Sequence, residues 1–362
     1  MKCGVGDYSC NLAKTLAAVP GTFVGVLTSK CGSGESGKQD GVEVLSVMEH
    51  WSLSEAPRVV KAIRNWSPDI VHVQYPTQAY ASALLPWFLP LICFLMGTKV
   101  VQTWHEDVTF RDLPKLLFRA MVPGGLVVVR PLYKERLGFF LRWALWNKKL
   151  EFIRNASVIP RIDLSQQQKR ELRNGYLNGQ RRLVVFFGFV NPNKGVELLF
   201  EIANPDCDQI VIAGDIGDTG HYRKELEGLA ANEPWRGKVT IVGFLPAQHA
   251  AGLLAVADVV ILPFRSGGGG WNTSIHAAIL QGTFVITTSR QRNGYEPKSN
   301  VYYTNVDDVQ EMKHALNIYA GRKRKYDENV DRDEWRQIAA EHLSFYQHLL
   351  SNVGARKPVY GK

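Results

Sequence analysis

The hydrophobic residues of the chain occur in short runs that are separated by amphipathic segments. In the first half, apolar and β-branched residues predict strands over residues 22–29, 69–75, 98–104 and 125–131. In the second half, similar runs predict strands over residues 181–189, 208–215, 238–244, 257–264 and 282–289. Near-continuous apolar strands that alternate with helices are typical of a parallel sheet covered on both faces. Because the pattern occurs twice, we expect an α/β protein with two doubly wound, Rossmann-like domains that face a central cleft.

The pattern also predicts where the segments of the chain begin and end. Residues 1–160 and 161–320 should each form one domain, and residues 321–362 should form a C-terminal helix and tail. In the last segment apolar residues recur near helical spacing, which predicts one apolar stripe made of Trp335, Ile338, Leu343, Tyr346 and Leu350. Only three residues precede the first Gly-rich turn, whereas a strand averages about five to six residues. We therefore expect the N-terminal domain to lack its first strand.

Composition narrows the class of partner. Lys and Arg number 43 against 34 Asp and Glu, which gives a net charge of +9. This balance favours acidic partners such as nucleotides, phosphates or an anionic membrane surface. The bases form no long run and fit no nucleic-acid-binding module, so no nucleic-acid partner is expected. The five cysteines are far apart, and neither a signal peptide nor a membrane-spanning stretch is visible. These features favour a cytoplasmic protein with free thiols.

A glycine-rich stretch, RSGGGGWNTS, follows the strand expected over residues 257–264 and leads into an apolar helical pattern. Glycines let the backbone approach a ligand closely, and a helix N-terminus attracts anions. The candidate anion-binding residues are Gly268, Gly269, Gly270, Asn272, Thr273 and Ser274. The alternative is a tight strand-to-helix turn in which Asn272, Thr273 or Ser274 only caps the helix.

Other candidates lie where expected strands end, because ligands of doubly wound sheets bind beyond the carboxyl ends of the strands. Gln74 and Tyr75 end one strand, and His105 follows the next, beside Glu106 and Asp107. Carboxylates near a histidine can tune its pKa, so His105 is a candidate for a functional role, with a structural hydrogen bond as the alternative.

Three further loops carry candidate residues. Lys194 lies in a turn before a helix, where it could bind a phosphate or merely be solvated. Gly4 and Gly6 lie in a second Gly-rich loop that leads into a helix. Asp215 and Asp218 could hold a metal ion, but capping of their loop is the preferred interpretation, and no metal site is expected.

In their order along the chain, several segments resemble the retaining glycosyltransferases of family 4, which have the GT-B fold. The segments are GVGDYSCNLAKTL, PDIVHVQYPT, VPGGLVVVRP, IRNASVIPRID, FGFVNPNKGVELL, VIAGD, VTIVGFLP, ADVVILPF and HAAILQGTFVITTS. The resemblance covers nearly the whole chain. It implies transfer of a sugar from a nucleotide-sugar to a glycan or lipid-linked acceptor with retention of configuration, with no cofactor and without a metal ion.

The resemblance also implies roles for the two domains. The N-terminal domain would hold the acceptor, and the C-terminal helix would return to pack on it. The acceptor-side residues would be Gly4, Gly6, Gln74, Tyr75 and His105, of which His105 would hydrogen-bond the transferred sugar. The C-terminal domain would hold the donor, with its diphosphate near Lys194 and the amides of residues 268–274.

The chain departs from the family's pattern at three positions. Gly269 and Ala277 stand where the family typically carries two glutamates eight positions apart, and Phe189 stands where it has an arginine. The sequence thus resembles an atypical branch, and two alternatives stay open. One is an enzyme like the nucleotide-sugar 2-epimerases, with Glu106 and Asp107 as candidates for proton removal. The other is a non-catalytic sugar-binding protein of the same fold.

Residues 134–154 interleave bases with large aromatic residues. The bases are Lys134, Arg136, Arg142, Lys148, Lys149 and Arg154, and the aromatic residues are Phe139, Phe140, Trp143 and Trp146. This composition is typical of an interfacial helix, and it predicts peripheral association with an anionic membrane surface. The alternative is that Phe140, Trp143 and Trp146 face the core while the bases are solvated.

Overall fold

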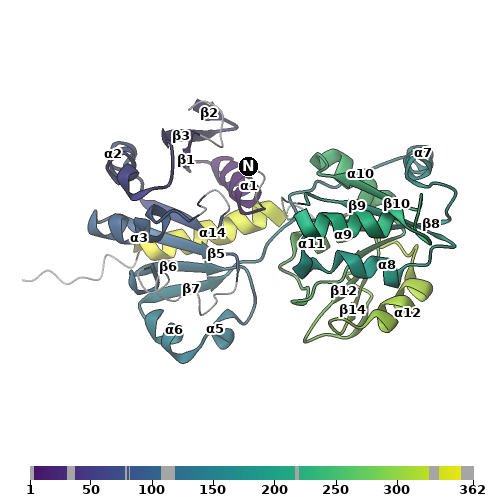
Figure 1. Ribbon diagram of the computed structural model, residues 1–362. Coiled ribbons are helices and arrows are strands. Elements are labelled where there is room, and N and C mark those ends of the chain that lie inside the picture. The colour runs from purple at the N-terminus through teal and green to yellow at the C-terminus, as the bar shows by residue number, and fades with distance from the viewer. Residues whose placement is uncertain are drawn as a thin grey trace, which may run out of the picture. The chain divides into compact units, whose positions relative to one another are not determined.

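The structure is a computed structural model that describes residues 4–30, 37–77, 80, 82–106, 119–216, 220–325 and 334–351. The chain forms two compact units (Figure 1). Unit 1 consists of Met1–Asn155 and Asp333–Lys362, and unit 2 consists of Ala156–Arg332. The C-terminal helix therefore groups with the N-terminal unit, and the boundary after Asn155 lies a few residues before the expected one.

Unit 1 contains two sheets where the sequence predicts one. The first has the order β1-β3-β2, and the second, which is wholly parallel, has the order β4-β5-β6-β7. The strands are β1 (Val24–Ser29), β2 (Gly37–Gln39), β3 (Val42–Met48), β4 (Ile70–Tyr75), β5 (Lys99–Trp104), β6 (Gly124–Val128) and β7 (Lys148–Phe152). Among the described residues β1 and β4 belong to different sheets and do not pair. The expected loss of the first strand stays a prediction.

The helices of unit 1 cover these sheets. They are α1 (Gly4–Ala17), α2 (Ala56–Trp66), α3 (Leu85–Leu95), α5 (Tyr133–Arg136), α6 (Phe139–Ala144) and α14 (Glu334–Ser351). Pro57 lies in the first turn of α2, where the missing N–H is harmless. The 3₁₀ turn η1 (Leu53–Glu55) leads directly into this helix.

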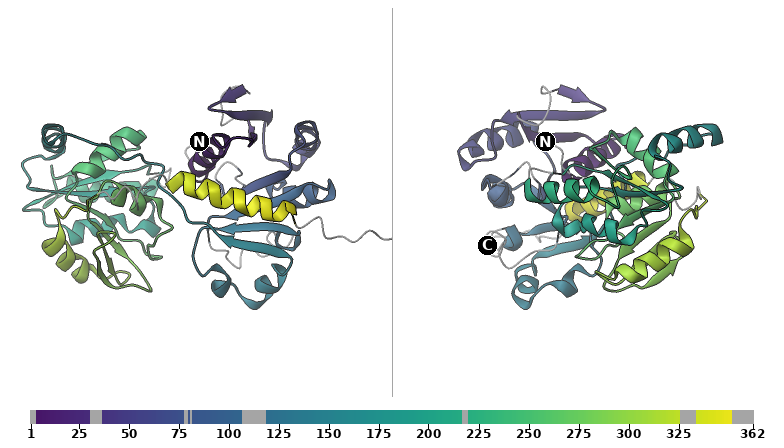
Figure 2. Two further views of the ribbon diagram at one scale, coloured as in Figure 1. Left: turned by 180° about the vertical axis from the view of Figure 1, so that it is seen from behind. Right: turned by 45° about the vertical axis from the view of Figure 1, so that its right-hand side comes forward.

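The helix α14 packs against unit 1 (Figure 2, left, where it is yellow). Gly125 on β6 has no room for a side chain, because a β-carbon there would lie 2.7 Å from both Phe345 and Leu349. The buried residues of α14 are Ile338, Ala339, His342 and Phe345. The predicted stripe was therefore partly wrong: Leu350 is exposed, and His342 and Phe345 occupy the buried face instead.

Unit 2 contains one seven-stranded sheet with the order β10-β9-β8-β11-β12-β14-β13. The strands are β8 (Arg182–Phe187), β9 (Asp208–Ala213), β10 (Val239–Gly243), β11 (Val259–Leu262), β12 (Val285–Thr288), β13 (Gly294–Glu296) and β14 (Val301–Thr304). Neighbouring strands of this sheet run parallel to each other, except that β13 pairs with β14 in the antiparallel direction. Strands β8, β9, β11 and β12 are buried along nearly their whole length, as continuous apolar runs predict.

Short helices flank this sheet and complete the Rossmann-like unit. They are α7 (Gln166–Tyr176), α8 (Leu199–Ile202), α9 (Gly220–Ala231), α10 (Ala247–Val256), α11 (Thr273–Leu280) and α12 (Val309–Tyr319), with 3₁₀ turns η4 (Pro192–Lys194) and η5 (Val196–Leu198). Their apolar faces pack on both sides of the sheet in one continuous core. The two-domain α/β architecture expected from the sequence is thus present.

Candidate functional site

Strands β8 and β11 of unit 2 are neighbours although they are not consecutive in the chain. From β8 the chain proceeds outward to β9 and β10, and from β11 it proceeds in the opposite direction to β12 and β14. The order of the strands therefore reverses between β8 and β11. In doubly wound sheets ligands bind beyond the carboxyl ends of the strands at such a point. The loops that follow β8 and β11 are the ones in which the sequence places Lys194 and the glycine-rich stretch.

The glycines after β11 lie tightly against the sheet. The amide of Gly268 donates to the carbonyl of Thr288, at 2.6 Å, and a β-carbon on Gly268 would lie 2.5 Å from the Thr287 hydroxyl. Gly269 is covered by the indole of Trp271, which a β-carbon would approach to 2.3 Å. A side chain at position 268 would clash with the sheet, and one at position 269 would require the Trp271 ring to move, whereas Gly270 has open space around it.

This packing gives a physical account of the departures from the two-glutamate pattern. A glutamate in place of Gly269 would collide with the Trp271 ring. Ala277, on α11, is completely buried among apolar residues, so a carboxylate there would lose its hydration. Neither position can hold a glutamate without rearrangement of the residues around it.

The first turn of α11 has no side-chain cap. Asn272 occupies the N-cap position, but its Oδ1 accepts a hydrogen bond from the amide of Gly269, at 2.9 Å, and not from the helix. His276 Nε2 lies 2.6 Å from the carbonyl of Gly270, which precedes the helix. Uncapped amides at a helix N-terminus carry partial positive charge. The interpretation of Asn272, Thr273 or Ser274 as a simple side-chain cap does not hold.

The loop after β8 is held by turns that place Lys194 next to β11. Asn191 accepts from the amide of Asn193 and so closes the η4 turn. Gly195 follows with φ +64°, and a β-carbon there would lie 2.5 Å from the carbonyl of Pro263. Lys194 Nζ lies 4.3 Å from the centroid of the Phe264 ring. The lysine is thus positioned against the end of β11 and is not simply solvated.

Gly188 brings the two loops into direct contact. It directly follows β8 and has φ +136°, and a β-carbon on it would lie 2.7 Å from the hydroxyl oxygen of Ser274. Gly214, at the end of β9, is similarly pressed against the carbonyl of Gly188. The start of α11, Ser274 included, therefore lies at the end of β8.

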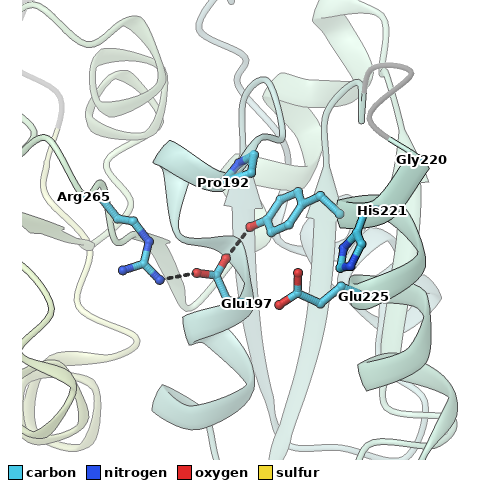
Figure 3. A pocket seen from close by; sticks show the side chains of 7 residues that line it. Pro192, Glu197, Gly220, His221, Glu225 and Arg265 are labelled. Carbon is cyan, nitrogen blue, oxygen red and sulfur yellow. Dashed lines mark hydrogen bonds and ion pairs between the residues drawn. The ribbon is translucent and has the colours of Figure 1, made fainter.

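A hollow of about 480 Å³ opens beside these loops (Figure 3). Its central group is the carboxylate of Glu197, which accepts from Arg265 at 2.5 Å and, through its second oxygen, from the hydroxyl of Tyr222. Arg265 also pairs with Asp307, at 2.9 Å. Burial and the neighbouring carboxylate raise the pKa of Tyr222 well above its ordinary value, so its hydroxyl stays protonated.

Sequence reasoning missed this group of charged residues. Glu197, Tyr222 and Arg265 come from the loop after β8, from α9 and from the loop after β11, and His221 and Glu225 complete the lining. One signal was available, because Arg265 directly follows the end of β11 at the start of the glycine-rich stretch. Nothing in the sequence pairs it with Glu197, which lies 68 positions away.

In unit 1 the strand-end residues form a half-buried polar chain. His105 Nε2 lies 2.8 Å from Gln74 Oε1, and Gln74 Nε2 lies 3.2 Å from His72 Nε2. His72 reaches the hydroxyl of Tyr346 on α14 through Nδ1, at 2.6 Å. The ring of His105 packs edge-on against Tyr8, with centroids 4.8 Å apart.

The imidazole of His105 is neutral over the physiological range. Burial, with a smaller contribution from His342, lowers its pKa to about 3. The adjacent Glu106 is exposed, and no tuning of His105 by carboxylates is found among the described residues. Asp107 lies outside the part of the chain that the structure describes, as does Asp218. His105 can therefore act as a hydrogen-bonding group but not as an imidazolium acid.

Two expectations for unit 1 are wrong. Tyr75 does not line an open surface: successive side chains of a strand point to opposite faces, and Tyr75 points into the core, where its hydroxyl donates to the carbonyl of Pro86. Gly4 and Gly6 are not in a loop, since α1 already begins at Gly4 and both glycines lie in its first turn, exposed. No group of three or more potential metal ligands is present among the described residues.

Residues 134–154 do not form one helix. They form the short helices α5 and α6 and the strand β7. Lys148 is buried and donates to the carbonyl of Val122, at 2.7 Å, and Arg154 pairs with Glu334, at 3.0 Å. These two bases are therefore engaged within unit 1. The side chains of Arg136 and Phe140 lie outside the described part of the structure.

Comparison with known proteins assigns the family. Residues 3–193 match Glycosyltransferase Family 4, and residues 167–318 match Glycosyl transferases group 1. A sulfoquinovosyl transferase of Arabidopsis thaliana is 26% identical over 235 residues, which are 59% of this chain and 42% of that protein. The chain spans less than half of the length of the curated relatives that it matches.

Solved structures share the fold over nearly the whole chain. A glycosyltransferase from Rickettsia africae superposes with a TM-score of 0.72 at 14% identity and covers 96% of both chains. Anabaena HepE in complex with UDP and glucose superposes with a TM-score of 0.62 at 15% identity, over 97% of this chain and 96% of that one. With both halves matched and this architecture observed, the chain belongs to the family-4-type glycosyltransferases of the GT-B fold.

Proposed function

We propose that the protein transfers a sugar from a nucleotide-sugar to a glycan or lipid-linked acceptor with retention of configuration. The observation that carries this proposal is the contact of Gly188 with Ser274, which brings the Lys194 loop to the uncapped start of α11. A diphosphate placed there would meet a lysine and several backbone amides at once. The complex of HepE with UDP and glucose supports a nucleoside diphosphate as the ligand type.

In this proposal the protein stabilises the charge that develops on the departing diphosphate. Lys194 contributes a point charge, and the amides of Thr273 and Ser274 together with the end of the α11 dipole contribute fixed partial charges. The amides of Gly268, Gly269 and Asn272 donate within the loop and to the sheet, so they hold its shape instead. The leaving diphosphate assists the incoming hydroxyl on the same face of the sugar, which gives retention. These groups neutralise the diphosphate without a metal ion, so a chelator should leave donor binding unchanged.

Unit 1 would supply the acceptor side. There His105 is held by Gln74 and Tyr8, and it is neutral, which suits a hydrogen bond to the transferred sugar. A hydrogen-bonding side chain that is held rigidly contributes by positioning the reacting groups. His105 is accordingly the residue that we assign to the reacting sugar.

A thermal-shift screen with UDP-, GDP-, ADP- and TDP-linked sugars tests the proposal. A ligand at about 100 times its dissociation constant adds roughly 2.7 kcal/mol of stability, which such a screen detects easily. With the donor identified, release of nucleoside diphosphate in the presence of acceptors distinguishes a transferase from a binding protein. A change of sugar configuration in the donor pool would identify an epimerase. Stabilisation by none of these donors would contradict the donor site.

We also propose that α5, α6 and their flanks attach the protein peripherally to an anionic membrane surface. Phe139, Trp143 and Trp146 are 79%, 58% and 72% exposed. Phe139 and Trp143 are four residues apart and share a face of α6, while Leu141 and Leu145 are buried behind them. The exposed bases Lys134 and Arg142 flank these rings. Aromatic rings among bases suit the interface of an anionic bilayer. None of the described helices is long and apolar enough to cross a membrane.

Vesicle flotation tests this attachment. The protein should float with vesicles that contain phosphatidylglycerol, should not float with pure phosphatidylcholine, and should be released at high salt. The double substitution Trp143→Ser and Trp146→Ser should abolish flotation. Phe23→Ser, which removes an aromatic ring that is 87% exposed elsewhere in unit 1, is the matched control and should float normally. Equal flotation of both variants would overturn the assignment.

A further inference from the structure

Arg265 links three loops at the edge of the unit 2 sheet where the proposed donor site lies. It begins the glycine-rich stretch after β11, while Glu197 lies in the η5 turn after β8 and Asp307 lies between β14 and α12. The guanidinium donates to Glu197 through Nη2, at 2.5 Å, and to Asp307 through Nη1, at 2.9 Å. Because β8, β11 and β14 all run in the same direction, one side chain reaches the loops that follow three strands.

The backbone around Arg265 is tied to the turn that holds Lys194. The amide of Arg265 donates to the carbonyl of Asn193, at 3.1 Å, one position before the lysine. One position after the lysine, Gly195 lies against the carbonyl of Pro263. The Lys194 turn therefore contacts the chain around Arg265 on both sides of the lysine.

The carboxylate of Glu197 cannot rotate freely, because both of its oxygens are engaged. Oε1 accepts from Arg265, and Oε2 accepts from the hydroxyl of Tyr222, which is buried on α9 (Figure 3). That hydroxyl accepts a hydrogen bond from the amide of Val196, at 3.1 Å, so its own proton is directed at Glu197. The hydrogen-bonded chain runs from α9 through Glu197 to Arg265 and fixes which way the carboxylate faces.

The guanidinium of Arg265 is likewise engaged at both ends. Its planar fork meets one carboxylate with each terminal nitrogen, which holds the group in one orientation. The side chain is 42% exposed, and ion pairs that reach solvent contribute little to stability. Arg265 therefore acts as a clamp that fixes the positions of the loops and adds little to the stability of unit 2.

We propose that Glu197 is a positioning residue of the donor site, which acts through Arg265 and does not itself contact the donor. Glu197 follows Lys194 by three positions, and Arg265 precedes Gly268 by three positions, so their ion pair sets the spacing between the two loops. With this spacing fixed, Lys194 and the start of α11 approach the diphosphate together. Misplacement by about 1 Å can cost a factor of about one hundred in rate. The inference rests on the proposed donor site.

Calorimetric titration of the full chain with UDP-, GDP-, ADP- and TDP-glucose tests the inference. Glu197→Gln keeps the size of the side chain and an acceptor for Tyr222 but removes the charge that holds Arg265. It should lower the affinity for the probe that binds the wild-type protein about tenfold, with a nearly unchanged melting temperature. Arg173→Ala is the matched control and should keep the wild-type affinity, because it breaks the ion pair with Asp258, at 2.6 Å, where β11 begins.

A double-mutant cycle shows whether Glu197 acts through the lysine. In the Lys194→Ala background, Glu197→Gln should weaken binding by a smaller factor than in the wild-type protein, because the charge that it positions is gone. Equal factors in the two backgrounds would show that Glu197 and Lys194 contribute independently and would overturn the inference. All titrations are made well below the melting temperatures of the variants, so a loss of stability does not change these factors.

The outcomes also separate this inference from the proposed function. Wild-type affinity in Glu197→Gln would overturn the inference and leave the donor site in place. Equal weakening in Glu197→Gln and Arg173→Ala would overturn it as well. If the wild-type protein binds none of the four probes, the proposed function fails and the inference fails with it. Arg265→Gln, which breaks the same ion pair from its other side, replaces Glu197→Gln if that variant does not fold.

Discussion

Gly188 faces the side chain of Ser274 so closely that a β-carbon on Gly188 would lie 2.7 Å from the serine hydroxyl. We predict that Gly188→Ala displaces Ser274 and lowers donor affinity at least tenfold. The new side chain must also adopt φ +136°. Gly179→Ala is the control: Gly179 has φ +78° and nothing within 4 Å, so this variant adds backbone strain alone. Positive φ costs roughly 1–2 kcal/mol. Calorimetry should show that only Gly188→Ala loses donor affinity.

Lys194→Ala should weaken donor binding about ten- to a hundredfold, because it removes one charge-assisted contact to the diphosphate. The variant should melt near the wild-type temperature, since the cation–π contact with Phe264 contributes little. Lys298→Ala, an exposed lysine between β13 and β14, controls for loss of net charge. Unchanged nucleotide-sugar affinity in Lys194→Ala would remove the lysine from the site.

Ser274→Ala is expected to lower donor affinity while leaving stability nearly unchanged, because α11 has no side-chain cap to lose. Ser165→Ala provides the opposite case. Ser165 forms a capping box with Gln168 at the start of α7, and its loss should cost about 1 kcal/mol of stability without any effect on the donor. Urea denaturation and donor titration of both variants check this. A stability loss in Ser274→Ala with full activity would show a structural role only.

His105→Ala should reduce kcat more than donor affinity, by about tenfold or more, since the interaction is expected mainly with the reacting sugar. Because burial holds its pKa at about 3, His105 does not titrate between pH 5 and 8. The pH–rate profile should therefore lack an inflection near pH 6.5 from this residue. His50→Ala, at an exposed histidine of unit 1, is the control. Wild-type kcat in His105→Ala would exclude a role at the reacting sugar.

Unit 1 should lose stability as the pH falls below about 6.5. His105 and His342 have folded-state pKa values lowered to about 3 and about 4, and burial lowers that of His72 as well. In the unfolded chain these histidines bind protons near pH 6.5, so acid favours unfolding between pH 6.5 and about 4. His105 and His342 each contribute about 1.4 kcal/mol per pH unit in this window, and His72 acts in the same direction.

Hydrogen exchange followed by peptide mass spectrometry localises this effect. Exchange from α14 and β4 should accelerate between pH 7 and pH 5, after correction for the intrinsic pH dependence, while the core strands of unit 2 serve as the internal reference. His342→Gln should reduce the pH dependence by about one histidine's share. An equal acceleration in both units would contradict the assignment to the buried histidines.

The sequence by itself determined the strands that are buried on both faces. Strands β8, β9, β11 and β12 are continuous apolar runs, and a run of that kind is recognisable without its neighbours. Strand β7 was missed because Lys148 and Glu151 interrupt it and because the surrounding aromatic residues suggest a helix. Strands β3 and β14 were also missed, because Glu43 and Ser46 interrupt the apolar pattern of β3 and because β14 is only four residues long.

The sequence also placed the Lys194 loop and the glycine-rich loop at strand ends, because parallel strands have all their carboxyl ends at one edge. Only the tertiary structure decided which strands are neighbours, and hence that Gly188 meets Ser274 and that Arg265 meets Glu197. Contacts between residues distant in the chain follow from sheet order, which no local pattern encodes. The same reason applies to Tyr75. Its position at the end of a strand was predicted, but its burial depends on α3, where the carbonyl of Pro86 accepts a hydrogen bond from the Tyr75 hydroxyl.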